Sequence, residues 1–326
     1  MTGGLNRLSA VFAAEVLVIA ALLTLALDIR AHANVERAGG VNVWGYRGPV
    51  AHQRQSNEIR IAVVGGTRAF GWGEPASALP SNLRQFIMAT TDRPGQPLRP
   101  VVVINLARLG ALPDTYPAAL SHYGYIRPDY ICVYDDLGER GAAFDAHASA
   151  VFELTGYAPT LPLMFHEKGM AWRFGTVSRG YEAAPLANGS GWRQAGGTAL
   201  QAGGAFLLGL DRAAGHAIGG ATKPVDETPP AYTTQIVAAI AAAHARARGV
   251  VLVLSPAESG VQAARRGALL ARLDSTASWL RVVDLEPHRE LRDPEMRIDG
   301  WNYGSAGITR TAQLIAPAFL DLIGVR

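Results

Sequence analysis

The stretch EIRIAVVGG, from Glu58 to Gly66, decides the fold. It is a run of β-branched and other apolar residues that ends in two glycines, which is typical of a buried strand followed by a tight loop. Apolar residues with helical spacing follow from Leu79 to Thr90. This strand, loop and helix predict the first unit of an α/β domain.

The same alternation continues along the rest of the chain. Further strands are predicted at 101–106, 130–134, 250–254 and 280–285, and helices at 115–125, 232–248, 261–273 and 305–323. Because the strands are almost uninterrupted apolar runs, they predict a parallel sheet that helices cover on both faces. Ligands bind such sheets beyond the carboxyl ends of the strands, so a site is expected in the loops after Gly66, Leu106, Tyr134 and Leu285.

Composition excludes several classes of protein. Of 326 residues, 49% are hydrophobic and 17% are charged, which excludes a mainly disordered chain. Lys168 and Lys223 are the only lysines and the arginines are scattered, so no nucleic-acid partner is expected despite the net charge of +3. Cys132 is the only cysteine, which excludes an intrachain disulfide and a cysteine-based metal site.

The amino-terminal segment predicts a membrane anchor. The apolar run from Ala10 to Leu27 is interrupted only by Glu15 and Thr24, and at about 1.5 Å per residue it nearly spans a hydrocarbon core of about 30 Å. A cleaved signal ending at Ala31-His32-Ala33 is the alternative, but the run exceeds the usual apolar length of such signals. We expect Glu15 to lie near the headgroups or to meet a partner.

Three parts of the chain follow from these patterns: an anchor at 1–30, a lead-in at 31–57 and an α/β domain at 58–326. A Gly, Pro and aromatic-rich insertion at about 141–230 shows little regular pattern.

The glycine-rich loop from Gly65 to Gly73 lacks both the G-K-[ST] ending and the G-x-G-x-x-G spacing of nucleotide sites. We therefore expect no cofactor.

Four blocks in order, RIAVVGGTRAFGWG, INLARLG, RPDYICVYDDLGER and DGWNYGSAGITRTAQLIA, resemble the SGNH/GDSL hydrolase family. The segment NVWGYRGPV, at 42–50, looks like the lead-in of membrane-anchored members. The resemblance implies a three-layer α/β/α, flavodoxin-like fold. It further implies a nucleophilic serine in the first block, a glycine and an asparagine of an oxyanion hole in the next two, and an aspartate and a histidine base in the last.

This chain departs from that set of residues. The corresponding positions are Thr67, Gly110, Gly138, Asp299 and Asn302. A threonine hydroxyl can act as a nucleophile, but the carboxamide of Asn302 has no pKa near neutrality and cannot accept its proton. The resemblance therefore implies a degenerate hydrolase whose site is vestigial.

Three possible compensations remain open in the sequence. His288, after the last strand, could replace the missing base, although a solvated loop histidine is the simpler interpretation. His166, in the insertion, could fold over the site as part of a lid. Acidic residues could also gather to bind a hard cation through oxygen atoms; they are Asp135, Asp136, Glu139 and Asp299. No complete set of ligands is visible, so no metal is expected.

We expect a membrane-anchored pseudoenzyme of the inner membrane, with its α/β domain on the periplasmic side, that serves as a structural or binding subunit of a larger complex; an energy-transducing complex is one candidate. Its protein contacts are expected at Glu15 and at large apolar residues of the insertion, which are Tyr157, Leu161, Leu163, Met164, Phe165, Trp172, Phe174 and Trp192. The alternatives are a divergent esterase or acyltransferase that uses Thr67 on envelope polysaccharide or lipid esters, and a carbohydrate or lipid binder.

Overall fold

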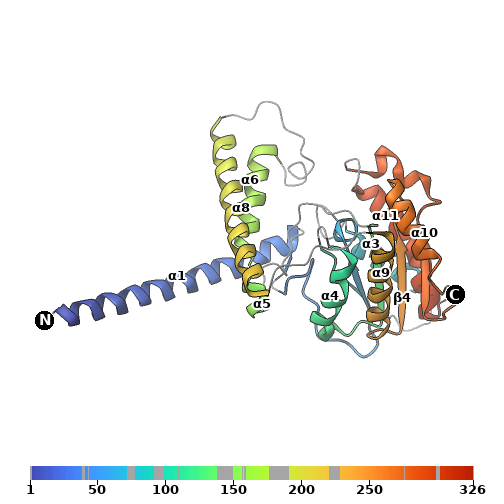
Figure 1. The fold of residues 1–326 in the computed structure, drawn as a ribbon, viewed down its shortest axis with the longest axis horizontal. Helices are drawn as coiled ribbons and strands as arrows, with labels where there is room; N and C mark the ends of the chain where they lie inside the picture. Colours follow the sequence, from blue (N-terminus) through green and yellow to red (C-terminus); the bar gives the residue numbers. More distant parts are fainter. Residues whose placement is uncertain are drawn as a thin grey trace.

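The computed structural model of the chain describes residues 2–38, 41–42, 44–71, 78–91, 99–108, 111–137, 150–155, 157, 159–175, 191–219, 228–274, 276–298 and 302–325. Figure 1 shows three parts: an α/β domain, a helical hairpin beside it and a long amino-terminal helix that projects from the hairpin on the side away from the sheet.

The sheet has five parallel strands in the order β2-β1-β3-β4-β5. The strands are β1 (Ile59–Gly65), β2 (Val101–Asn105), β3 (Tyr130–Asp135), β4 (Gly249–Leu254) and β5 (Leu280–Asp284). The order 2-1-3-4-5 is that of flavodoxin-like sheets. In these sheets the strand order reverses between β1 and β3, because β2 is added on one side of β1 and β3 on the other. The predicted parallel, flavodoxin-like sheet is therefore confirmed.

Two apolar layers enclose the sheet because successive side chains of a strand point to opposite faces. Ile61 and Val63 of β1 face one layer, and Ala62 and Val64 face the other. The first layer is covered by α3 (Leu79–Thr91) and α11 (Ser305–Ile323), and the second by α4 (Tyr116–His122), α9 (Pro229–His244) and α10 (Gly260–Leu270). These helices confirm those expected from the periodicity, within a few residues at their ends.

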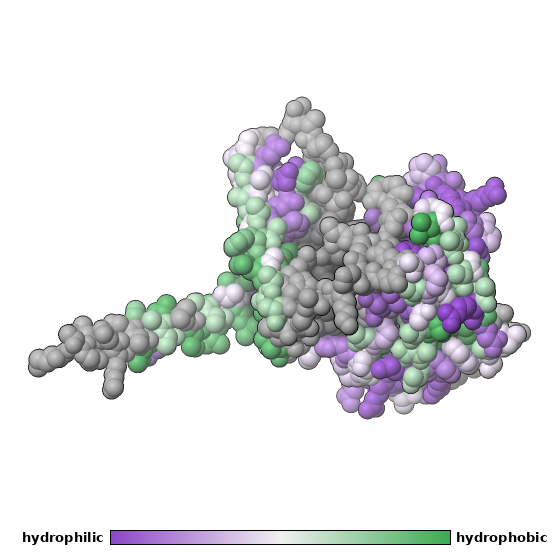
Figure 2. Space-filling model, in the orientation of Figure 1, coloured by the Kyte–Doolittle hydropathy of each residue, from purple (hydrophilic) through white to green (hydrophobic). Residues whose placement is uncertain are grey.

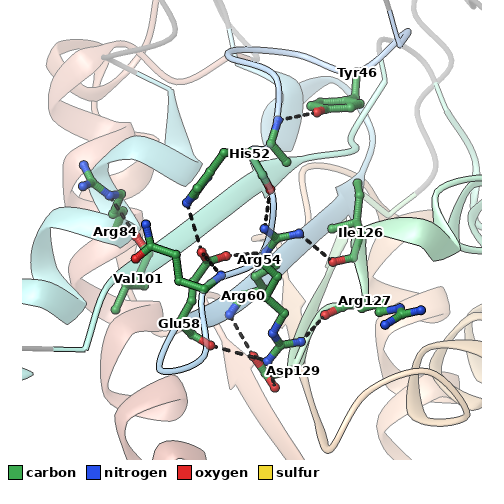
Figure 3. Close-up of polar contacts among 12 residues, drawn as sticks. Tyr46, His52, Arg54, Glu58, Arg60, Arg84, Val101, Ile126, Arg127 and Asp129 are labelled. Atoms are coloured by element: carbon green, nitrogen blue, oxygen red, sulfur yellow. Dashed lines mark hydrogen bonds and ion pairs between the residues drawn. The ribbon is translucent and has the colours of Figure 1, made fainter.

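A charged network holds the amino edge of the sheet, opposite the edge where a site is expected (Figure 3). The carboxylate of Asp129 accepts hydrogen bonds from the Arg54 guanidinium, at 2.7 Å, and from the backbone N–H of Arg60, at 2.9 Å. Arg60 also pairs with Glu58, and both side chains are buried. Each buried charge here therefore has a partner of opposite sign, as buried ions require.

The insertion is more regular than the sequence indicated, so the expectation of little regular structure is wrong. It contains α5 (Ala150–Thr155), α6 (Leu161–Phe174) and α8 (Gly191–Gly219), and α6 and α8 pair along their lengths as a hairpin. Glycines let the two backbones approach closely: a Cβ on Gly204 would lie 2.5 Å from the carbonyl oxygen of Pro162. Some of the glycines that suggested irregular chain, such as Gly197 and Gly204, are therefore packing positions of a helix.

The amino-terminal helix α1 (Thr2–Ala38) contains a segment, Val11–Ala31, that is long and apolar enough to cross a membrane, with a mean hydropathy of 2.2. The helix continues past residue 30, where the anchor was expected to end. The lead-in then packs on the domain, since Asn42, Tyr46 and Arg47 are buried. Arg47 pairs through its backbone with Asn105 at the end of β2.

Asp28 joins α1 to the hairpin. Its carboxylate accepts hydrogen bonds from the backbone N–H groups of Thr160, at 2.9 Å, and Leu161, at 2.6 Å, and from the hydroxyl of Tyr157. Thr160 gives α6 no side-chain cap, so Asp28 supplies the cap from a different helix. The carboxyl-terminal part of α1 is thereby fixed to the first turn of α6.

Candidate functional site

The carboxyl end of β1 reaches very close to that of β3. A Cβ on Gly65 would lie 2.8 Å from the carbonyl oxygen of Tyr134, and one on Gly66 would lie 2.5 Å from a carboxylate oxygen of Asp136. Thr67 follows as the first residue of the short helix α2 (Thr67–Phe70) and is partly exposed. The two glycines thus place the Thr67 hydroxyl at the sheet edge where the fold predicts a site.

A carboxylate lies against the first backbone N–H groups of α2. Asp136 is 6% exposed, and its Oδ2 accepts a hydrogen bond from the N–H of Arg68 at 3.1 Å. Burial, and after it the nearby Asp136, raises the pKa of Tyr116 well above its usual value. A hydrolase needs donors here that are open to a developing oxyanion, whereas this N–H already donates to a carboxyl group.

The side chain of Arg68 connects the first sequence block to the last. Its guanidinium is fully buried, lies 3.5 Å from the carboxylate of Glu258 and sits over the ring of Tyr303, 5.1 Å from its centre. Arg297 pairs with the same carboxylate at 2.6 Å. The neighbours of Thr67 and Asn302 are therefore in contact, which brings the predicted nucleophile and base positions to one edge of the sheet.

Asn302 lies in a tight turn just before α11. Its backbone carbonyl accepts a hydrogen bond from the N–H of Ile298 at 2.9 Å, and the backbones of Arg297 and Tyr303 form a bridge. Its Oδ1 is buried. The turn delivers an amide to the place where the resemblance implies an imidazole, and an amide cannot take a proton from a hydroxyl at neutral pH.

Asp135 is the second carboxyl group at the end of β3, and it is completely buried. Burial raises its pKa to about 7, while hydrogen bonds from the Tyr232 hydroxyl and the Leu137 N–H act in the opposite direction. The Leu137 bond is 2.8 Å long. Leu137 itself has a φ of 57°, an unusual value for a non-glycine residue that this carboxyl group stabilises. Asp135 therefore fastens the turn after β3.

His166 and His288, the two histidines that could have replaced the base, make other contacts. His166 lies between the hairpin helices, where its Nδ1 is 3.2 Å from the carbonyl oxygen of Gln201, so the suggested lid over the site is wrong. His288 lies 3.5 Å from Glu290 on the surface after β5. Among the residues that the structure describes, no group of three or more His, Cys, Asp or Glu side chains is placed to hold a metal ion.

Several predicted site residues lie outside the described residues. These are Gly110, Gly138, Glu139 and Asp299. Their roles stay predictions, and so does the composition of the vestigial oxyanion hole. Of the implied set, the structure places Thr67 and Asn302.

The predicted interface residues of the insertion divide into two groups. Tyr157 and Leu161 make the internal contact with Asp28, while Met164 and Phe174 are partly buried. The more exposed aromatic residues are Phe165 at 37%, Trp172 at 40% and Trp192 at 67%. The side chain of Leu163 is not among those described. Glu15 is exposed on α1, within the segment that could span a membrane.

Trp172 and Trp192 meet at the end of the hairpin farthest from α1. Their rings contact edge to face with centres 5.9 Å apart, and Arg193 lies 5.6 Å from the centre of the Trp192 ring. We call these three residues, with Arg173, the hairpin tip. Exposed tryptophan with neighbouring arginine is the composition that protein interfaces favour.

Sequence reasoning missed Arg68, the position of Asp136 and the role of Asp28. A buried arginine directly after the nucleophile position gives no signal in a single sequence. The Asp28 contact joins residues that lie far apart in the chain, so no local pattern could reveal it. The apolar residues Phe206, Leu207 and Leu210 of α8 could have been found from their helical spacing, had the glycines not suggested a loop.

No protein-family model and no curated protein matches this sequence. Solved structures similar to it include a protein of the G-D-S-L family described as lipolytic, from Desulfitobacterium hafniense DCB-2, at 11% identity with a TM-score of 0.42, covering 79% of this chain and 98% of that one. Another is an alpha/beta hydrolase enzyme from the metagenome of Lake Arreo, Spain, at 13% identity and a TM-score of 0.41, covering 82% and 95%.

A family two carbohydrate esterase from Cellvibrio japonicus is also similar, at 11% identity and a TM-score of 0.38, covering 86% of this chain and 65% of that one. The three are described as a lipolytic protein, a hydrolase and an esterase. The strand order, which is observed directly, is what establishes the flavodoxin-like sheet of the present chain.

Proposed function

We propose that this chain is a membrane-anchored, non-catalytic domain that serves as a binding or structural subunit of a larger membrane or envelope assembly. The observation that carries the proposal is the Asp136 carboxylate, 3.1 Å from the N–H of Arg68. An oxyanion forming within about 4 Å of that charge would be destabilised by on the order of 4 kcal/mol at an effective dielectric constant of about 20.

The amide at Asn302 adds to this effect. An amide at that position cannot remove the proton of the Thr67 hydroxyl at neutral pH. Loss of one member of a catalytic triad costs several powers of ten in rate, and a misplaced charge costs about a further thousandfold. Ester hydrolysis through Thr67 would therefore be very slow.

The other half of the proposal concerns what the chain binds. Val11–Ala31 anchors it in the inner membrane, and the α/β domain lies on the periplasmic side. The hairpin tip is the contact with a protein partner, since Trp192 is 67% exposed and stands beside the guanidinium of Arg193. An edge-to-face tryptophan pair flanked by arginine offers a large, rigid surface at little entropic cost.

Purification from native membranes in mild detergent tests this function. The wild-type chain is expected to elute with stoichiometric partner proteins, and the double variant Trp172→Ala/Trp192→Ala to elute without them. Trp44→Ala is a matched control, because Trp44 is also exposed, at 49%, but belongs to the lead-in. A wild-type chain that elutes as a free monomer would contradict the subunit proposal.

A further inference from the structure

The outward face of α8 is apolar along its whole length. The residues that recur on this face at helical spacing are all exposed, and none is charged or polar: Trp192, Ala195, Ala199, Ala202, Gly203, Phe206, Gly209, Leu210, Ala213 and Ala217. A 29-residue helix at a protein surface ordinarily alternates polar and apolar faces so that its polar face meets water. This one turns an apolar face outward.

The opposite side of α8 is already occupied. Gly197, Gly204 and Gly215 are buried, and the first two pack on the backbone or side chains of α6. Within the described part of the chain the outward face has no cover, since Phe206 remains 65% exposed and Leu210 53% exposed. A continuous apolar surface of this kind marks a contact with something outside the chain.

The position of α1 indicates what that contact is. Asp28 lies close to the end of the segment Val11–Ala31 and caps the first turn of α6. If the segment spans a bilayer, the end of that segment lies at the headgroups, so the base of the hairpin is held at the same level. The hairpin cannot be distant from the membrane surface.

The orientation of the hairpin agrees with this position. In Figure 1 the hairpin runs across the direction of α1, so it lies along the surface of a membrane that α1 crosses. Figure 2 shows that the side of the hairpin from which α1 extends is green to white, whereas purple residues lie toward the sheet domain. The apolar face and the membrane span are therefore on the same side.

We propose that the α6–α8 hairpin lies flat on the bilayer surface, with the outward face of α8 buried among the headgroups and the first part of the acyl chains. This inference rests on the membrane anchorage in the proposed function. Phe206 and Leu210 enter the apolar layer, as the apolar face of an interfacial helix does, while the hairpin tip remains open to a protein partner. The small residues of the outward face let the helix lie close to the surface.

Site-directed spin labelling of the full chain in nanodiscs tests the inference. Discs that hold one copy each are prepared with single labels from Phe206→Cys, Leu210→Cys and Ala213→Cys on the outward face. Thr198→Cys, exposed on the flank of the same helix, is the matched control, and Leu22→Cys reports on the anchor. The native Cys132 is fully buried and stays unlabelled.

Labels on the outward face and at Leu22 are expected to collide with lipid-soluble oxygen several times more often than with an aqueous nickel complex, and the label at Thr198 to show the reverse. Labels at Phe206, Leu210 and Ala213 that are open to nickel while Leu22 is in lipid would overturn the inference and leave the anchor intact. Protection that appears only in discs with two copies would also overturn it, in favour of self-association. A nickel-accessible Leu22 would contradict the anchor itself.

Discussion

The sheet domain and the hairpin bury apolar surface in opposite ways. In the sheet domain, branched side chains fill two layers, and residues such as Ile61 and Val63 are 0% exposed. In the hairpin, glycines bring two backbones together, and large side chains such as Phe206 face outward. The first arrangement is complete in itself, whereas the second needs an external surface. This difference is the basis of the proposal that the hairpin, and not the edge of the sheet at Thr67, is the part that binds.

Rebuilding a hydrolase site in the sheet domain tests whether Asp136 suppresses ester hydrolysis. In a Thr67→Ser/Asn302→His background, adding Asp136→Asn is expected to raise ester turnover by roughly 10³, because it removes a charge worth about 4 kcal/mol beside the oxyanion. Asparagine can still accept the hydrogen bond from the Arg68 N–H, so the turn should persist. Turnover of a chromogenic acetyl ester by the double and triple variants gives the ratio, and thermal melts check folding. Equal rates would show that Asp136 does not suppress chemistry.

The stability of the sheet domain is expected to depend on pH through Asp135. Its folded pKa of about 7 lies above its ordinary value of 3.8, so the folded state binds the extra proton. The raised pKa therefore contributes its full stabilisation of the folded state below about pH 4, and this contribution is lost as the pH rises from about 4 through 7. Roughly three pKa units correspond to about 4 kcal/mol.

Asp135→Asn is expected to remove this dependence, because the amide stays neutral and can still accept the bond from the Leu137 N–H. Urea unfolding of the full chain in detergent at pH 5 and pH 8 measures it. The control is Asp274→Asn, at an exposed carboxylate. A wild-type chain whose stability rises from pH 5 to pH 8 relative to Asp135→Asn would contradict the assignment.

Adjacent glycines in α8 test the packing of the hairpin. Gly204→Ala is expected to destabilise it by about 1–3 kcal/mol, because the new Cβ would meet the α6 backbone 2.5 Å away. Gly203→Ala meets nothing within 4 Å and is expected to stabilise the helix by up to about 1 kcal/mol. Thermal unfolding followed by circular dichroism compares the two. Similar effects at both positions would mean that α6 and α8 do not pack as described.

The link between α1 and the hairpin is expected to show the smallest effect. Asp28→Ala removes the acceptor for the first N–H groups of α6, a change worth about 1 kcal/mol for a helix cap. Amide hydrogen exchange at Thr160 and Leu161 should accelerate about fivefold, while Glu15→Gln on the same helix should leave it unchanged. Unaltered exchange in Asp28→Ala would remove the argument that α1 fixes the level of the hairpin.

Local patterns in the sequence were enough to predict the sheet domain. Its strands are apolar runs whose period and order determine a parallel sheet, and this also located Thr67 at its carboxyl edge. The hairpin could not be predicted in the same way, because Gly197 and Gly204 look like loop residues until the partner helix is known. Asp136 near the Arg68 N–H is a contact between distant segments, so no local pattern could indicate that a carboxyl group lies beside α2.

Labelling of the purified full-length chain with an active-site fluorophosphonate tests the central claim most directly. Fluorophosphonates bond covalently to hydroxyl nucleophiles that a base has activated. The account predicts that wild type and Thr67→Ala give the same background, while an active serine esterase in the same tube is labelled fully. Labelling of wild type that disappears in Thr67→Ala would show a working nucleophile and contradict the claim that the Thr67 site is silent.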